Sequence, residues 1–222
     1  MRLDLHSHSR YSPDSRLDPV DLAKAARRAG LDGVAITDHN SLAGARAAKE
    51  YADGLHDFLV IPAIEISSSE GHVLGYGVRE AIPRDLPPRE TVERIVAAGG
   101  VAVAAHPYRF WSGLGEGATV AAPFAAYEVA NARTLRRGNT RAVALADRQS
   151  VGHVGGSDAH FLDEVAAAVT VVESGPTTVD EVLDAIAHRR TAASGRHRGA
   201  AATVRYVSKC VGEWLGRGFR RI

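Results

Sequence analysis

Apolar residues recur along the chain in two alternating patterns. Short apolar runs typical of buried strands lie at 3–5, 33–37, 58–66, 71–76, 101–105, 127–131, 151–156 and 168–173. Segments with apolar residues at helical spacing lie between them, at 19–29, 41–53, 88–98, 136–149 and 179–189. This alternation predicts an α/β protein with a mainly parallel sheet, either a closed barrel or a doubly wound sheet. One interpretation makes 71–76 an antiparallel partner of the strand before it.

Local signals fix the ends of some elements. Asp18-Pro19 supplies an N-cap and a first-turn proline for the first helix, and Gly30 ends that helix. The segment with Gly113, Gly115 and Gly117 is expected to be a loop.

Metal-ligand residue types follow the apolar runs at five places. They are His6 and His8, His39, Glu65, His106, and Asp158 and His160. The ends of parallel strands converge on one face of a closed barrel, whereas a doubly wound sheet spreads them along a line. The distribution of these residues therefore favours a barrel.

Each candidate also has a structural explanation. His6 and His8 are two apart on a strand, so their imidazoles project to the same side and suit a metal, but a pair of partly exposed histidines is the alternative. Asp38 could cap the following helix. Glu65 is harder to explain structurally, because a carboxylate after the apolar run 59–64 needs a strong partner.

Taken together, these motifs resemble a known family. The matching residues are His6-x-His8, Asp14, Thr37-Asp38-His39, Glu65, His72, Ala105-His106-Pro107 and Ser157-Asp158-Ala159-His160. They resemble the polymerase and histidinol phosphatase (PHP) family of metal-dependent phosphoesterases. The resemblance implies a distorted (β/α)7 barrel, with two or three divalent metal ions (Mn, Zn or Fe) at the C-terminal face of its strands.

The resemblance implies nine metal ligands in three groups. They are His6, His8, Glu65 and Asp158; Glu65, His72 and His106; and Asp14, His39 and His160. Glu65 would bridge the first two groups. Asp14 is preferred to Asp18 because of its spacing from His8. Asp38 is expected to orient a ligand rather than to bind metal.

Imidazole and carboxylate ligands suit Zn²⁺, Mn²⁺ or Fe²⁺. Two such ions roughly 3.5–4 Å apart can activate a water and clamp both oxygens of a phosphoryl displacement, so no Ser or Cys nucleophile is required. The expected catalytic residues are Asp158, His160 and Glu65, with His160 a candidate for protonating the leaving group. Arg109 is expected to grip a phosphate. Arg133 is either a second phosphate contact or a solvated surface arginine.

Composition is that of an ordinary soluble globular protein. Hydrophobic residues make up 45% and charged residues 24% of the 222 residues, and Cys210 alone can form neither an intramolecular disulfide nor a thiolate metal cluster. The first strand pattern starts at Arg2 and leaves no room for a signal sequence, so a cytoplasmic protein is expected. The longest apolar run, 95–105, is too short to span a bilayer.

Charge divides the chain into two parts. The net charge is +1 overall, but residues from Arg196 onward hold seven Lys or Arg against one Glu. We expect a PHP-type domain over 1–195 and a basic, amphipathic C-terminal helix within 196–222. Packing of that helix on the barrel is the favoured interpretation, and contact with nucleic acid or with a membrane surface are the alternatives.

The substrate is predicted from the resemblance alone. The chain is similar to small stand-alone members that act on nucleoside 3′,5′-bisphosphates and on short 5′-phosphorylated RNA or DNA. It departs from them between His72 and His106, where their helical insertion is missing. The alternatives are a phosphomonoesterase acting on a metabolite such as histidinol phosphate, and a non-catalytic regulatory module. An amidohydrolase-type enzyme is a weaker alternative because no Lys lies at a strand end.

Overall fold

The computed structural model describes residues 1–173, 175, 178–197, 208 and 211–212. The strands in these ranges are β1 (Arg2–Asp4), β2 (Gly33–Ile36), β3 (Leu59–Ser67), β4 (His72–Tyr76), β5 (Val101–Ala104), β6 (Ala126–Asn131), β7 (Gly152–Gly156), β8 (Ala168–Val172) and β9 (Thr191–Gly195). The helices are α1 (Pro19–Arg28), α2 (Ala43–Ala52), α3 (Pro88–Ala97), α4 (Gly115–Ala121), α5 (Arg136–Gln149) and α6 (Val179–Ala187), with a 3₁₀ turn at Leu162–Glu164.

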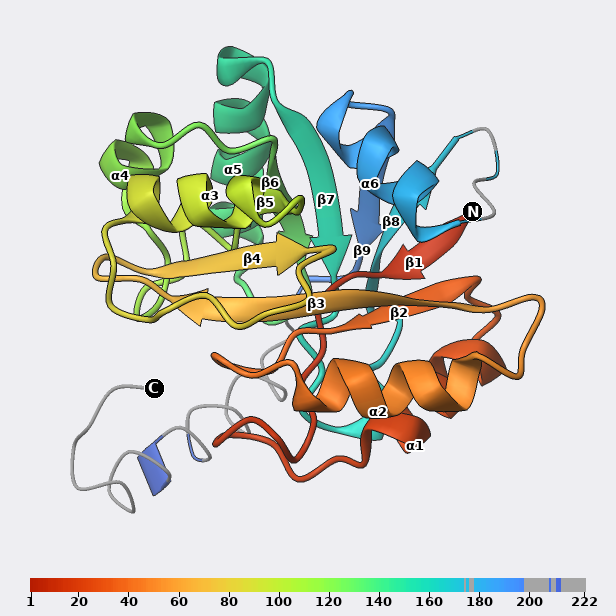
Figure 1. Cartoon of the computed structure of the whole chain (residues 1–222). Coiled ribbons are helices and arrows are strands. Elements are labelled where there is room, and N and C mark those ends of the chain that lie inside the picture. The colour runs from red at the N-terminus through yellow and green to blue at the C-terminus, as the bar shows by residue number, and fades with distance from the viewer. Residues whose placement is uncertain (174, 176–177, 198–207, 209–210, 213–222) are drawn as a thin grey trace.

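The strands form one sheet that curls into a nearly closed barrel, which confirms the predicted fold class. Their order is β7-β6-β5-β4-β3-β2-β1-β8-β9. The two ends of this order meet, since β7 packs against β8 and β9 and the Gly155 N–H donates to Thr170 Oγ1 over 2.9 Å. The helices surround the sheet, with α1 and α2 beside β2 and β3, and α3, α4 and α5 on the other side (Figure 1).

Strand directions only partly match the predicted parallel sheet. The β1-β2-β3 and β5-β6-β7 sets are parallel, while β4 is antiparallel to both β3 and β5, as one interpretation of the sequence proposed. β8 is antiparallel to β1, and β9 to β8, so a parallel arrangement is wrong for these two strands. The link from β7 to β8 contains only the 3₁₀ turn, so no crossover helix returns the chain to the other end of the barrel.

Side chains that alternate along the strands fill the barrel. On β3, Ile61 and Ala63 belong to the same buried cluster as Leu3 of β1 and Tyr76 of β4. The α6 residues Val182, Ala185 and Ile186 also belong to this cluster, so α6 closes the barrel at the end opposite to the strands' C-termini. Glu65 lies two residues after Ala63 and therefore continues the inward-facing series at the open end.

Two elements differ from the sequence prediction. The glycine-containing segment expected as a loop forms α4, which packs on α3 and buries Thr119 although glycine disfavours helix. The strand β9 has small residues and partly exposed side chains, and it forms by pairing along its length with β8. The predicted basic C-terminal helix lies mostly outside the described residues.

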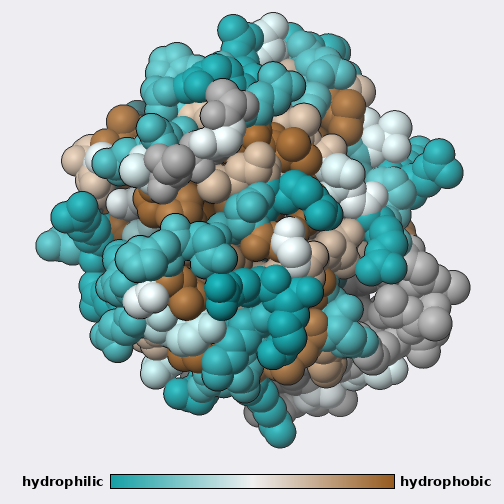
Figure 2. Space-filling view, turned by 90° about the vertical axis from the view of Figure 1, so that its right-hand side faces the viewer, coloured by the Kyte–Doolittle hydropathy of each residue, from teal (hydrophilic) through white to brown (hydrophobic). Residues whose placement is uncertain are grey.

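The face of the molecule drawn in Figure 2 is mainly hydrophilic. Figure 2 shows the side on which the N-terminus lies in Figure 1, and hydrophobic residues form small separate patches there. Within the described ranges, we find no helix with both the length and the hydropathy required to cross a membrane.

Candidate metal centre

The nine predicted ligands gather at the end of the barrel that α6 leaves open. Eight of them are buried, and the side chain of His72 is 14% exposed. His6 and His8 follow β1, His39 follows β2, Glu65 lies in β3, and His106 follows β5. Asp158 and His160 follow β7, Asp14 lies in the loop after β1, and His72 begins the antiparallel strand β4. Convergence of strand ends therefore produces the cluster expected for a barrel.

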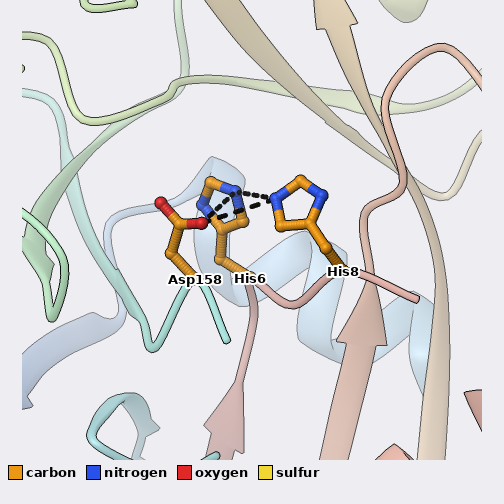
Figure 3. A group of neighbouring side chains, drawn as sticks. All are labelled: His6, His8 and Asp158. Carbon is orange, nitrogen blue, oxygen red and sulfur yellow. Dashed lines mark hydrogen bonds and ion pairs between the residues drawn. The ribbon is translucent and has the colours of Figure 1, made fainter. Parts of the chain in front are cut away.

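The first group is formed by His6, His8, Glu65 and Asp158. Glu65 Oε2 lies 3.2 Å from His6 Nε2 and 3.1 Å from His8 Nε2. Asp158 Oδ1 lies 3.5 Å from His8 Nε2 and 3.9 Å from His6 Nε2. Figure 3 shows His6 and His8, from the segment after β1, and Asp158, from the segment after β7, turned toward one another. Two nitrogens and two oxygens thus converge on one point.

The second group uses the other oxygen of Glu65. Glu65 Oε1 lies 2.9 Å from His72 Nδ1 and 3.1 Å from His106 Nε2. The ligand atoms of these three residues all lie within 4.8 Å of one another. The two oxygens of Glu65 thus face different groups, which is the arrangement that a bridging carboxylate requires.

The third group lies beside the first. Asp14 Oδ2 is 2.7 Å from His160 Nε2 and 3.4 Å from His39 Nε2. The ligand atoms of His8, Asp14 and His160 lie within 4.8 Å of one another, so His8 connects the third group to the first. Asp18, the rejected alternative to Asp14, caps α1 and pairs with Arg10.

Glu128 is a buried residue of this centre that the sequence reasoning missed. Its Oε1 lies 2.9 Å from His6 Nδ1, and its Oε2 accepts the backbone N–H of His106 at 2.8 Å. It also accepts from Asn131 Nδ2 at 3.0 Å. A signal for it is present in the sequence, because Glu128 is a carboxylate within an apolar strand, as Glu65 is, but it lies in the middle of that strand and not at its end.

Contacts at Nδ1 determine which histidine nitrogen faces the cluster. His6 Nδ1 contacts Glu128, and His160 Nδ1 contacts the carbonyl oxygen of Asp158 at 2.9 Å. Both partners accept hydrogen bonds, so Nδ1 carries a proton and Nε2 is the nitrogen that faces the centre. This tautomer is the one that binds metal through Nε2.

The donor set fits divalent cations. His6 Nε2 and His8 Nε2 face each other at 3.1 Å, and both also face Glu65 Oε2. Asp158 Oδ1 is buried without a hydrogen-bond partner. Buried acceptors that point at one another are stabilised by a shared cation, and imidazole with carboxylate is a typical ligand set for Zn²⁺, Mn²⁺ or Fe²⁺.

The electrostatics hold the carboxylates in their charged forms. Burial acts to raise the pKa of Asp158, but Arg109 and His6 hold it well below its usual range. Burial, aided by Arg133, lowers the pKa of His160 to about 3, so this imidazole is neutral at pH 7. Burial also lowers the pKa of His39, but the Glu65 and Asp14 carboxylates outweigh it and raise that pKa to about 9. The neighbouring carboxylates thus favour a positive charge at this position.

Asp38 lies beside the cluster without joining any of the ligand groups. Its carboxylate accepts both the backbone N–H and the hydroxyl of Ser9 at 2.6 Å. Ser9 directly follows His8, so Asp38 fixes the chain that carries this histidine. It does not cap α2, whose N-cap is Leu42 without a side-chain hydrogen bond.

Two arginines contact Asp158. Arg109 donates to the Asp158 carboxylate and, over 2.8 Å, to Asn131 Oδ1. Arg133 is 5% exposed and donates to the Asp158 carbonyl oxygen at 3.4 Å, so the alternative of a solvated surface arginine is wrong. The Arg109 and Arg133 guanidinium groups thus lie beside the ligand cluster.

Backbone strain coincides with the cluster. Asp158 has φ 55° and His106 has φ 26°, a region that residues other than glycine seldom adopt. The Asp158 N–H donates to the His6 carbonyl at 2.7 Å, and the His8 N–H donates to Ala159 at 2.9 Å. These bonds tie the two ligand-bearing loops together and maintain the strained conformation.

Comparisons with known proteins identify related sequences. A family model described as "PHP domain" matches residues 4–157, and one described as "PHP-associated" matches residues 136–191. An uncharacterized protein of Methanocaldococcus jannaschii, MJ1587, is 39% identical over 118 residues, which cover 49% of this chain and 68% of that protein. Phosphoribosyl 1,2-cyclic phosphate 1,2-diphosphodiesterase of Eggerthella lenta is 37% identical over 86 residues, but this match covers 36% of this chain and 32% of that enzyme.

The fold also resembles that of solved structures. A two-domain protein of Bacteroides vulgatus, described as containing a predicted PHP-like metal-dependent phosphoesterase, superposes with a TM-score of 0.69 at 20% identity. The match covers 95% of this chain and 70% of that protein. At this identity the likeness establishes the fold.

Proposed function

Because the chain belongs to the PHP domain family, we propose that its metal centre hydrolyses phosphate esters. One observation carries this proposal. Four ligand atoms, His6 Nε2, His8 Nε2, Glu65 Oε2 and Asp158 Oδ1, converge beside a guanidinium group, that of Arg109. A cation site next to an arginine is the combination that binds and polarises a phosphate.

The nine ligands in their three groups would hold two or three divalent ions. When bound, these ions would supply Lewis-acid stabilisation of the phosphoryl group and a water of lowered pKa. Glu65 and Asp158 would hold the ions in place, and Glu128 would fix the Nε2-binding tautomer of His6.

The remaining roles belong to the side chains at the rim. Arg109 would bind a non-bridging phosphate oxygen, and Arg133 would orient Asp158 through its carbonyl oxygen. His160 is the candidate residue for protonating the leaving oxygen. It can donate only while its Nε2 binds no metal ion, because its Nδ1 already donates to the Asp158 carbonyl oxygen.

The proposed substrates are nucleotides or short 5′-phosphorylated nucleic acids. The direct test incubates the Mn²⁺-loaded protein with a short 5′-phosphorylated RNA, with Asp158→Asn as the inactive control. Mononucleotide products would identify a 5′-3′ exonuclease, and inorganic phosphate alone would identify a phosphomonoesterase. No product from the wild-type protein would contradict hydrolysis of nucleic acid.

A small cyclic phosphodiester is a second candidate substrate. The observation in its favour is the sequence similarity to the diphosphodiesterase of Eggerthella lenta. This similarity extends over 36% of this chain and 32% of that enzyme. A ribose 1,2-cyclic phosphate and a histidinol phosphate sample, assayed in parallel with RNA, would separate the three substrate classes.

A further inference from the structure

Two large aromatic side chains are exposed in the turn that follows His106. Phe110 is 85% exposed and Trp111 is 79% exposed, in a chain with five Phe and two Trp. Their rings pack edge to face, with centroids 4.5 Å apart and an interplanar angle of 81°. Exposed aromatic pairs are unfavourable in water, so such a pair indicates a surface that binds something.

The loop that carries this aromatic pair is held firmly. The Arg109 N–H donates to the His106 carbonyl at 2.8 Å, and the Gly113 N–H donates to the Arg109 carbonyl at 3.0 Å. A Cβ on Gly113 would lie 2.6 Å from the carbonyl oxygens of Arg109 and Pro107, so the turn requires glycine. The two exposed rings are therefore carried by a turn of defined conformation.

Both ends of the pair adjoin the proposed metal centre. Arg109, the preceding residue, contacts Asp158 and Asn131. Ser112, the following residue, accepts the backbone N–H of His72 at 3.1 Å. Since neighbouring Cα atoms are about 3.8 Å apart, the Cα atoms of Phe110 and Trp111 lie within about 8 Å of the Cα atom of Arg109.

Other exposed apolar side chains lie on loops of the same end of the barrel. Tyr11 follows β1, Leu135 follows β6 and Leu162 follows β7, and they are 42%, 59% and 41% exposed. The mouth of the centre thus combines buried cations and carboxylates with an apolar rim, which suits a ligand with both a charged and a flat apolar part.

We propose that Phe110 and Trp111 form a stacking platform for the base of a nucleotide whose phosphate lies at Arg109. This inference rests on the proposed function and narrows its substrate class to base-bearing phosphate esters. A nucleotide carries its aromatic base one sugar away from its phosphate, and Phe110 and Trp111 directly follow Arg109 in the turn. Stacking tolerates any base, so the platform would not select a sequence.

Fluorescence tests the platform without turnover. The Trp214→Phe background leaves Trp111 as the single tryptophan, and the probes are a 5′-phosphorylated trinucleotide and the same molecule with an abasic first residue. We expect the base-bearing probe to quench Trp111 emission and to bind about 10-fold more tightly or better than the abasic probe. Equal quenching or equal affinity for the two probes would overturn the platform.

Activity supplies the second readout. We expect Phe110→Ala and Trp111→Ala to reduce the kcat/KM preference for the base-bearing probe over the abasic one by about 10-fold. The matched control is Val96→Ala, which changes an apolar residue of α3 that is 59% exposed. This variant should keep the preference of the wild-type protein. If the wild-type protein hydrolyses both probes and these variants keep its preference, the platform is wrong and the proposed hydrolysis stands. If wild type hydrolyses neither, the proposed function fails and the fluorescence result alone decides the platform.

Discussion

At the scale of single residues, buried side chains that bind no substrate determine which nitrogen of a histidine faces the proposed metal centre. Glu128 accepts from His6 Nδ1, from the His106 backbone N–H and from Asn131 Nδ2. The histidine motifs predicted residues that gather in this cluster, because their spacing is visible in the chain. The partners of those histidines could not be predicted in the same way, since Glu128 lies 122 positions after His6 in the sequence and meets it only in the folded chain.

Replacing Glu128 tests this tautomer control. In Glu128→Gln one acceptor oxygen becomes a donor amide, which must then face a hydrogen-bond donor. We expect Mn²⁺ affinity to fall by about 10- to 100-fold in a calorimetric titration, the usual effect of losing a partner that orients a ligand. Glu116→Gln, whose side chain is half exposed on α4, is the matched control. Equal affinities of the two variants would show that Glu128 has no such role.

At the scale of elements, packing decided what the sequence patterns could not. Asp18 caps α1 as predicted, because a cap is a local signal. β9 and α4 were missed because their residues have weak local preferences, and they form by pairing with β8 and by packing on α3. The start of α2 shows the same dependence, since a Cβ on Gly44 would lie 2.0 Å from Asp38 Oδ2 and 2.4 Å from Ser9 Oγ.

Because of this close approach, we expect alanine to change the free energy of unfolding differently at Gly44 of α2 and at Gly117 of α4. Gly44→Ala should lower the free energy of unfolding by about 1–3 kcal/mol, since the methyl group displaces buried side chains. Gly117→Ala, on α4 with nothing within 4 Å of its Cβ position, should be neutral or stabilising by up to about 1 kcal/mol. Urea denaturation measures both. Loss of the same stability in both variants would mean that α2 does not depend on the Ser9–Asp38 contact.

At the scale of the whole molecule, the barrel concentrates buried charge at one end. Glu65, Asp158, Asp14 and Glu128 are all less than 9% exposed there, and burying carboxylates is costly unless cations neutralise them. Ion binding is therefore expected to stabilise the folded barrel, in addition to any role in hydrolysis.

Metal removal tests that coupling. Binding at about 100 times the dissociation constant contributes about 2.7 kcal/mol, which corresponds to a shift in Tm of about 5–10 °C for a domain of this size. We expect EDTA to lower the Tm of the wild-type protein by this amount and Mn²⁺ to restore it. His8→Asn should show a smaller response. A Tm that EDTA leaves unchanged would contradict coupling between metal and fold.

The measurement that tests the central claim most directly is the metal content of the purified protein. Inductively coupled plasma mass spectrometry would compare wild type with Glu65→Gln, after dialysis against Mn²⁺ and removal of free ions. Since Glu65 faces two ligand groups, we predict two or three ions per wild-type chain and the loss of at least one in the variant, together with loss of phosphate ester hydrolysis. A wild-type chain that retains no metal, or a variant with the wild-type content, would contradict the assignment of this cluster as a metal centre.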